Sequence, residues 1–173
     1  TSATNWTAIA AGGTHTVAIK SGDELLTPAA IAQGRIAFHS ESPDGGSRIF
    51  VMNADGSEQS PLTKSGLNDW GDPEQGRMPS WSPDGTKIAY ISGQCISWPS
   101  QPCHPHQDFE IHVMNGDGSA DTQLTDDSVW VGPNPAAWSP DGTKIAFRGV
   151  YYPSDGSLAG DEIYVMNADG SGQ

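Results

Sequence analysis

The chain has 173 residues, of which 21 are glycine and 13 are proline, and its formal net charge at pH 7 is −13. So many turn-forming residues, with only 35% hydrophobic residues, favour short strands joined by turns. The negative charge repels a phosphate backbone, which argues against nucleic acid and anionic membranes as partners. No apolar run approaches the about 20 residues that cross a bilayer, so membrane insertion is not expected.

The first predicted elements are two strands, 7–11 and 15–20, joined by a Gly-Gly turn. The segment 6–22 that contains them resembles the core of an RCC1-type repeat, the unit of one propeller family, although other segments of a full repeat are absent. His15 falls on a position that is usually structural in that family, so we expect it to pack rather than to catalyse. We therefore separate residues 1–32, an RCC1-like strand pair and linker, from residues 33–173.

Three near-copies of one phrase follow in the larger part of the chain. Each is an alternating apolar strand that runs into an Asp-Gly turn, and they span residues 49–57, 111–119 and 163–171. A second phrase, Trp-Ser-Pro-Asp-Gly-Thr-Lys-Ile-Ala, begins at Trp81 and again at Trp138, and a degenerate copy occupies residues 33–38. Self-similarity with a period of about fifty residues indicates a propeller or another repeat array.

One repeat contains four short predicted strands, 79–82, 87–91, 110–114 and 122–125, which together make one antiparallel propeller blade. We predict an all-β fold, a propeller-like array of about three such blades with the N-terminal strand pair. Trp81 and Trp138 should occupy equivalent inner-strand positions, with Ile88 and Ile145 packed between sheets. Residues 33–173 resemble the WD40-like PD40 repeats of TolB-type β-propellers, and this resemblance implies a module that acts through protein contacts in the cell envelope.

The third repeat reaches Gln173 where its outer strand is expected, and an open strand edge is a template for pairing with another chain. Either residues 5–11 of the same chain fill this place or those of a neighbouring copy do, which would give a ring or a filament. We therefore predict a non-enzymatic extracellular structural protein that self-assembles by strand completion. The alternative is a protein- or glycan-binding propeller module of the cell envelope.

The long connections, 65–78, 93–110, 126–137 and 150–162, are expected on the side opposite the short Asp-Gly turns. Long loops on one rim of a rigid scaffold are where binding usually resides. Their aromatic side chains form the predicted binding face: Trp70, Trp98, Trp130, Tyr151 and Tyr152.

Carboxylates gather in the same connections and suggest calcium. The Asn-x-Asp-Gly-Ser turns lack the first acidic ligand and the bidentate Glu of a calcium loop, so we expect their Asp to accept local backbone N–H groups instead. The long loops offer more hard oxygen atoms, and we name as candidate ligands Asp69, Asp72, Glu74, Asp126 and Asp127. Simple solvated charge is the alternative at these positions.

Cys95 and Cys103 lie in one proline-rich loop, and in an exported protein this spacing predicts a disulfide. A zinc site with the neighbouring His104 and His106, or two unpaired thiols, are the alternatives, although the spacing is not a recognised zinc pattern. Asn5 begins an N-glycosylation sequon, which with a disulfide fits an extracellular or periplasmic address. No signal peptide is visible, so an exported chain would already be processed.

Catalytic motifs are missing from the sequence. It has no Gly-x-Ser-x-Gly elbow, no His-Glu-x-x-His pair and no phosphate-binding glycine loop followed by lysine. The histidines are scattered, and His112 falls within a strand, where a packing or surface role is expected. We therefore expect no enzymatic activity and no cofactor apart from calcium.

Overall fold

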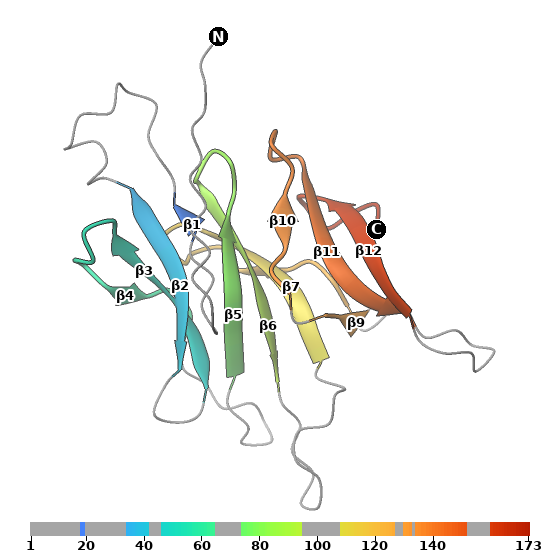
Figure 1. Cartoon of the computed structure of the whole chain (residues 1–173), viewed down its shortest axis with the longest axis horizontal. Helices are drawn as coiled ribbons and strands as arrows, with labels where there is room; N and C mark the ends of the chain where they lie inside the picture. The colour runs from blue at the N-terminus through green and yellow to red at the C-terminus, as the bar shows by residue number, and fades with distance from the viewer. Residues whose placement is uncertain are drawn as a thin grey trace, which may run out of the picture.

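The computed structural model describes residues 18–19, 34–41, 46–64, 74–94, 108–126, 130–132, 134–151 and 160–173. The regular structure in these segments consists entirely of β-strands, which fan out in three groups (Figure 1). They are β1 (Ala18–Ile19), β2 (Arg35–Glu41), β3 (Ser47–Asn53), β4 (Ser60–Pro61), β5 (Glu74–Trp81), β6 (Lys87–Gln94), β7 (Asp108–Asn115), β8 (Thr122–Gln123), β9 (Trp130–Val131), β10 (Ala137–Trp138), β11 (Lys144–Tyr151) and β12 (Gly160–Asn167). The predicted all-β class is confirmed.

The strands pair as three successive antiparallel blades. The first blade has the order β1-β2-β3-β4 and the second β5-β6-β7-β8, and a single parallel pair, Ser47 with Gln75, joins the two. In the third blade, β9 and β10 both pair with β11, which pairs with β12. β1 lies within the predicted strand 15–20 and takes the innermost place of the first blade.

Equivalent rows of side chains cross the three blades. Trp81 pairs with Ile88 and Trp138 with Ile145, so the two tryptophans hold equivalent inner-strand positions, as the repeat predicted. The rows continue into the third strand with the pairs Ile36–Met52, Ile88–Met114 and Ile145–Met166. Ile88 and Ile145 are fully buried and Trp81 is almost so, which confirms that these rows pack between sheets.

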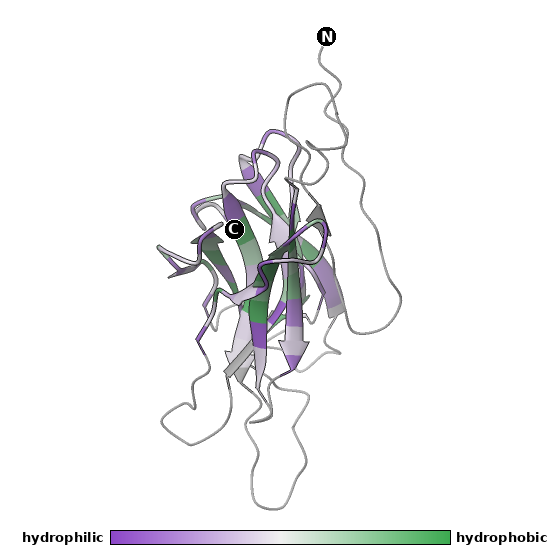
Figure 2. Ribbon diagram, turned by 90° about the vertical axis from the view of Figure 1, so that its left-hand side faces the viewer, coloured by the Kyte–Doolittle hydropathy of each residue, from purple (hydrophilic) through white to green (hydrophobic). Residues whose placement is uncertain are grey.

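The core lies in the two spaces between neighbouring blades. The first space is filled by Ala37, Ile49, Val51, Trp81, Ile88, Tyr90 and Met114. The second is filled by a larger cluster that includes Ile91, Phe109, Ile111, Val131, Ile145, Phe147 and Met166. Figure 2 shows hydrophobic residues along the strands and hydrophilic residues in the turns. Because successive side chains of a strand point to opposite faces, one strand contributes to both spaces.

The short turns lie together at one end of the blades. The Gly116 N–H, in the turn after β7, donates to the Thr86 carbonyl, in the turn before β6, over 2.8 Å. The first-to-second and third-to-fourth turns of the second blade therefore share one side, as predicted. Gly118 and Gly170 have positive φ angles of 85° and 87°, conformations that favour glycine.

Asp side chains stabilise these turns in the manner that the sequence suggested. The carboxylates of Asp55, Asp117 and Asp169 each accept the backbone N–H two residues later, over 2.9, 2.9 and 3.0 Å. Hydrogen bonds from the serine hydroxyl, and then from its backbone N–H, lower the pKa of all three carboxyls. The local hydrogen bonds expected for the Asp residues of these turns are thus confirmed.

The first strand of the second blade is longer than predicted. β5 begins at Glu74 and continues through an irregularity between Arg77 and Ser80, where Met78 has a φ of 54°. The third blade interrupts the same strand, which appears as the separate strands β9 and β10. A left-handed backbone conformation at a non-glycine residue leaves no mark in the hydrophobic pattern of the sequence. The sequence therefore predicted this strand only from residue 79 onward.

None of the segments that the structure describes forms a helix with the length and apolar character that a membrane crossing requires.

Candidate functional site

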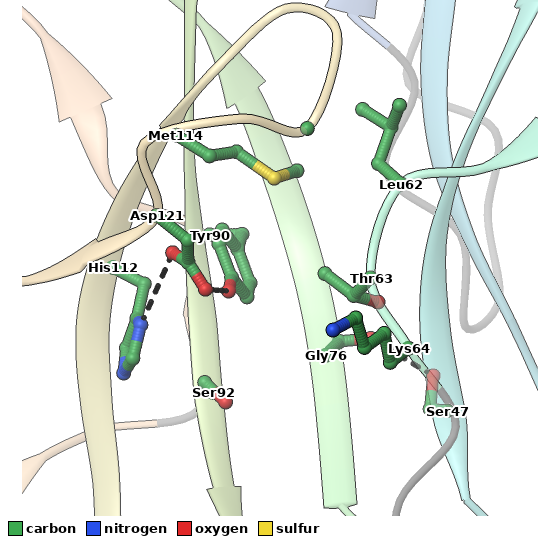
Figure 3. Close-up of a pocket in the computed structure, with 11 residues that line it drawn as sticks. Ser47, Leu62, Thr63, Lys64, Gly76, Tyr90, Ser92, His112, Met114 and Asp121 are labelled. Carbon is green, nitrogen blue, oxygen red and sulfur yellow. Dashed lines mark hydrogen bonds and ion pairs between the residues drawn. The ribbon is translucent and has the colours of Figure 1, made fainter.

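A pocket of about 400 Å³ opens between the first and second blades (Figure 3). The first blade contributes residues of β3 and the residues after β4, and the second blade contributes residues of β5, β6, β7 and the turn before β8. We call this pocket the inter-blade groove. Its described lining residues are Ser47, Leu62, Thr63, Lys64, Gly76, Tyr90, Ser92, His112, Met114, Gly118 and Asp121.

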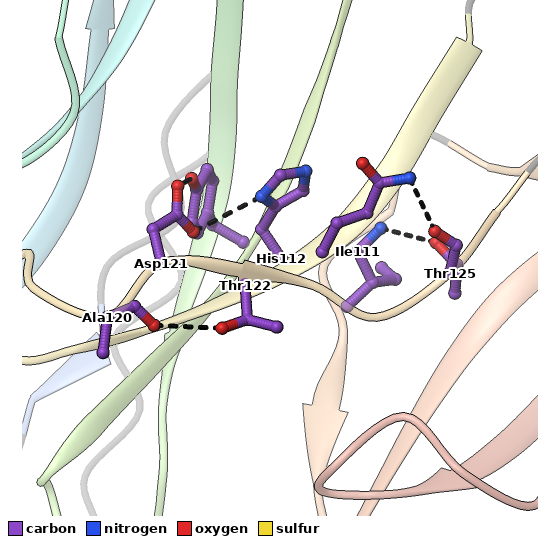
Figure 4. A network of polar contacts seen from close by, with 8 residues as sticks. Ile111, His112, Ala120, Asp121, Thr122 and Thr125 are labelled. Carbon is purple, nitrogen blue, oxygen red and sulfur yellow. Dashed lines mark hydrogen bonds and ion pairs between the residues drawn. The ribbon is translucent and has the colours of Figure 1, made fainter.

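A polar network occupies the second-blade wall of the inter-blade groove. The Tyr90 hydroxyl donates to Asp121 Oδ2 over 2.7 Å, and His112 Nδ1 lies 3.3 Å from Asp121 Oδ1. Figure 3 shows the Asp121 carboxylate between the two rings, and Figure 4 shows its contact with His112. Asp121 therefore ties together a residue of β6 and a residue of β7.

The register explains why these side chains meet. Tyr90 and His112 are directly opposite each other in the β6–β7 pair, and their ring centroids are 5.4 Å apart. The other blades carry apolar or less polar pairs at the same register: Phe38 with Phe50, and Phe147 with Tyr164, both stacked at 5.6 Å. The second blade has thus replaced an aromatic stack by a polar pair that faces the groove.

Asp121 is charged in this setting. Partial burial raises its pKa, but hydrogen bonds from His112 and Tyr90 outweigh that effect and lower the pKa below its ordinary value. An ionised carboxylate only accepts hydrogen bonds, so His112 must donate through Nδ1. The described residues make no hydrogen bond to its Nε2, so that atom can serve a ligand, as an acceptor when the ring is neutral and as a donor when it is protonated.

The first-blade wall is fixed by hydrogen bonds to the backbone. The Ser47 hydroxyl donates to the Gly76 carbonyl over 3.0 Å, and the Ile49 N–H donates to Thr63 Oγ1 over 3.0 Å. Lys64, the next residue along the chain, is exposed and places a cation on this wall. The groove therefore presents an ammonium group on one side and a carboxylate and an imidazole on the other.

The second blade repeats the threonine contact outside the groove. The Ile111 N–H donates to Thr125 Oγ1 over 2.8 Å, the equivalent of the Ile49–Thr63 contact in the first blade. Thr125 also donates to the Glu110 carboxylate, and both side chains are buried (Figure 4 shows the Ile111–Thr125 contact). This pair stabilises the outer strand and takes no part in the groove.

The site residues predicted from the sequence mostly lie outside the described residues. This holds for Asp69, Asp72, Asp127, Trp70, Trp98, Tyr152, Cys95, Cys103 and Asn5. The structure gives only the backbone of Glu74 in β5, Trp130 in β9 and Tyr151 in β11, and it places Asp126 on the surface. Among the described residues, no group of three or more His, Cys, Asp or Glu side chains could hold a metal ion. The calcium site, the aromatic face, the disulfide and the glycosylation therefore stay predictions.

Sequence reasoning missed Tyr90 and Asp121 and treated His112 only as a packing or surface residue. A comparison of the repeats could have pointed to these residues, because Tyr90 stands at the register position that Phe38 and Phe147 hold in the other two blades. His112 takes the place of Phe50 opposite that position. What the repeats alone do not show is that the turn before β8 brings Asp121 back to both rings.

No protein-family model matches this chain, and no curated protein matches it. Among solved structures it is similar to a puromycin-hydrolyzing peptidase of Mycobacterium tuberculosis, with a TM-score of 0.55, 18% identity and coverage of 94% of this chain and 24% of the peptidase. It also matches TolB of Acinetobacter baumannii, with a TM-score of 0.46, 14% identity and coverage of 91% of this chain and 39% of TolB. For an oligogalacturonate lyase of Vibrio parahaemolyticus, the TM-score is 0.49, the identity 15% and the coverage 96% of this chain and 53% of the lyase.

The chain thus spans between 24% and 53% of the length of these three proteins. At these identities the similarity shows only a shared fold. The fold assignment rests on the peptidase, whose TM-score is 0.55. Function has to be argued from the site itself.

Proposed function

We propose that this chain is a non-enzymatic β-propeller module that binds a polar segment of a partner protein in the inter-blade groove. One observation carries the proposal: the second blade has the Tyr90–Asp121–His112 network where the first blade has the stacked pair of Phe38 and Phe50. A stacked apolar pair would serve the packing of a blade equally well. The polar version supplies hydrogen-bonding groups to an open pocket, which is what a ligand needs.

Binding accounts for the groove better than catalysis does. Asp121 orients His112 as a carboxylate orients a catalytic imidazole, yet no hydroxyl or thiol among the described residues donates to that ring. Within the described part of the chain, the pair therefore has no nucleophile to activate. The Tyr90 hydroxyl is already committed as a donor to Asp121, which makes it a fixed part of the wall.

The shape of the groove favours a protein segment over a glycan. Sugars commonly pack on the exposed face of an aromatic ring, whereas Tyr90 is only 2% exposed. A volume of about 400 Å³ suits one or two side chains of an extended segment. Lys64 on one wall and Asp121 on the other would pair with opposite charges on such a segment.

The predicted export, the Cys95–Cys103 disulfide and the calcium site on the long loops belong to the same proposal. A module that meets its partner outside the cytoplasm benefits from a disulfide and from calcium, both of which persist there.

A transplant of first-blade residues into the second blade tests the proposal. The triple variant Tyr90→Phe, His112→Phe, Asp121→Gln installs the residues found at the equivalent positions of the first blade, Phe38, Phe50 and Gln59. Because the first blade folds with these residues, the variant should fold and lose only the polar network. Tyr164→Phe in the third blade is the matched control, since it removes a hydroxyl at the position equivalent to His112 but outside the groove.

Peptides selected from a displayed library against the wild-type chain should bind the triple variant at least about 10-fold more weakly, because a hydrogen bond to a charged group contributes about 1.5–3 kcal/mol. The control should bind them unchanged. Binding that depends on the groove with an immobilised glycan array, and with no peptide, would replace the proposed ligand class. Ligands that bind wild type and triple variant equally would contradict the proposal.

A further inference from the structure

The inter-blade groove offers a ligand more hydrogen-bond donors than acceptors. The Tyr90 hydroxyl and His112 Nδ1 both contact Asp121, so each oxygen atom of that carboxylate is already engaged. Within the described part of the chain, no hydrogen bond is made by the Lys64 ammonium group, the Ser92 hydroxyl or His112 Nε2. An ammonium group only donates, and a hydroxyl can donate. The chemical complement of such a surface is a group that only accepts, which in a protein segment is a carboxylate.

These three groups border the groove from opposite sides. Tyr90 and Ser92 are two residues apart on β6 and therefore share a face of the sheet, and Tyr90 pairs with His112 of β7. Ser92 and His112 thus lie on the same wall. Lys64 belongs to the first blade, and Figure 3 shows its side chain directed toward the second blade. A side chain that enters the groove therefore meets donors on both sides.

Protonation of His112 adds a donor without disturbing the polar network. Because Nδ1 already donates to the Asp121 carboxylate, a second proton on the ring has to go to Nε2. Nε2 then changes from an acceptor to a donor, and the ring gains a positive charge. The His112 side chain is 19% exposed, so solvent and a ligand can both reach it.

The charges that line the groove cancel until His112 is protonated. Lys64 contributes one positive charge and Asp121 one negative charge, so their sum is zero while the imidazole is neutral. With the protonated ring the sum is one positive charge, which a single carboxylate balances. At physiological salt, charges beyond about 8 Å are largely screened, so these local charges matter more to a ligand than the distant part of the net charge of −13.

Few other ionisable groups face His112. The described ones on the surrounding elements are Tyr90 of β6, Glu110 of β7, Asp121 before β8 and Lys64 across the groove. Arg77 of β5 pairs with Ile91 and therefore faces the other side of the sheet. Glu110 is buried and accepts a hydrogen bond from Thr125. A substitution of His112 alone separates its titration from that of Glu110.

We infer that the partner segment inserts an acidic side chain into the inter-blade groove, where its carboxylate accepts hydrogen bonds from the protonated Nε2 of His112 and from Ser92, opposite the Lys64 ammonium group. This inference rests on the proposed function and names the group that the groove recognises. Because only the protonated ring donates from Nε2, binding takes up a proton from the solvent. The affinity therefore rises as the pH falls through the range in which the imidazole gains its proton.

Titration calorimetry with peptides selected from a displayed library tests this inference on the full chain. A selected peptide should contain an acidic residue and should bind at least about 10-fold more tightly at about pH 5.5 than at about pH 8. The same peptide with glutamine in place of that residue should bind at least about 10-fold more weakly at the lower pH. Titrations at about pH 7 in two buffers of different ionisation enthalpy should show the uptake of up to about one proton per peptide.

Two variants of the chain assign the proton and the charge. His112→Gln keeps an amide that can donate to Asp121 but gains no charge, so it should abolish the pH dependence. Lys64→Gln should weaken binding by a similar factor at both pH values. Lys87→Gln is the matched control, because it removes the same charge at an exposed position of the second blade outside the groove, and it should bind as the wild type does.

The outcomes separate this inference from the proposed function. Peptides that bind the wild type but not the triple variant, and that lack an acidic residue or bind equally at both pH values, overturn the inference and leave the proposed function standing. A pH dependence that survives His112→Gln assigns the proton to another group, such as Glu110, and also overturns it. Peptides that bind the triple variant as tightly as the wild type contradict the proposed function and this inference together.

Discussion

Trp138 Nε1 donates a hydrogen bond to the carbonyl oxygen of Ser80 over 3.1 Å and so joins the third blade to the second. Trp81 is its register equivalent one blade earlier, yet the buried Trp81 Nε1 has no hydrogen-bond partner among the residues that the structure describes. The Trp81 ring instead lies against Gly116, in the turn of its own blade. Two copies of one sequence phrase therefore make different contacts at successive junctions.

This difference predicts unequal effects of the same substitution. Trp138→Phe removes a hydrogen bond between blades, so it should lower the free energy of unfolding by about 1 kcal/mol beyond the loss of packing. Trp81→Phe removes no hydrogen bond and relieves a buried unpaired N–H, so its cost should be the smaller of the two. Denaturant unfolding of both variants measures the difference. A larger loss of stability for Trp81→Phe would show that the contact with Ser80 contributes nothing.

Gly116 is required by the position of the Trp81 ring. A Cβ at this residue would lie 2.8 Å from Trp81 Cζ3, so the ring would have to shift. Gly116→Ala should therefore lower the free energy of unfolding by about 1–3 kcal/mol, as overpacking does. Gly160→Ala is the control, because nothing lies within 4 Å of its added Cβ. Equal stability of the two variants would contradict the proposed ring contact.

We expect the Asp141 carboxyl, in the turn before β11, to have a lowered pKa. Hydrogen bonds from the Ser139 hydroxyl, and then from the Thr143 N–H and hydroxyl, lower the pKa of Asp141 from 3.8 to about 2. Because the folded pKa is the lower one, the turn is stabilised above pH 3.8 and loses this contribution as the pH falls toward 2. Carboxyl titration by NMR should give a midpoint near the lower value, and Ser139→Ala should move it upward. An unshifted midpoint in the wild type would refute the turn geometry.

Calcium should bind weakly or moderately on the long-loop side, through oxygen atoms of Asp69, Asp72, Glu74, Asp126 and Asp127. The reason is the density of carboxylates in a chain of net charge −13. Titration calorimetry with calcium, and the melting temperature before and after chelation, measure this. Neither heat nor a change in melting temperature would remove the site.

The sequence predicted the blades well because the repeat marks both strands and turns. Alternating apolar residues placed the rows through Ile88 and Ile145, and the Asp-Gly pairs placed the turns. It could not predict how far β5 extends, because the backbone at Met78 adopts a left-handed conformation that no residue pattern announces. Nor could it predict that Trp81 and Trp138 make different contacts, since these depend on neighbours in other blades.

The candidate site was harder to predict for the same reason. The inter-blade groove combines Thr63 and Lys64 of one blade with Tyr90, His112 and Asp121 of the next, residues that only the packing of blades brings together. Sequence reasoning looked instead for dense local clusters and therefore named the long loops. The exposure of Ile163 was equally hidden, because its sequence context matches that of the buried Ile49 and Ile111.

NMR mapping of a selected peptide shows whether a polar protein segment binds between the first and second blades. Side-chain and backbone signals are followed as the peptide is added to the isotope-labelled chain. We expect the largest shifts at His112, Asp121 and Lys64, and unchanged signals for Phe147 and Tyr164 in the third blade. Shifts that concentrate away from the groove, with His112 and Asp121 unaffected, would contradict it.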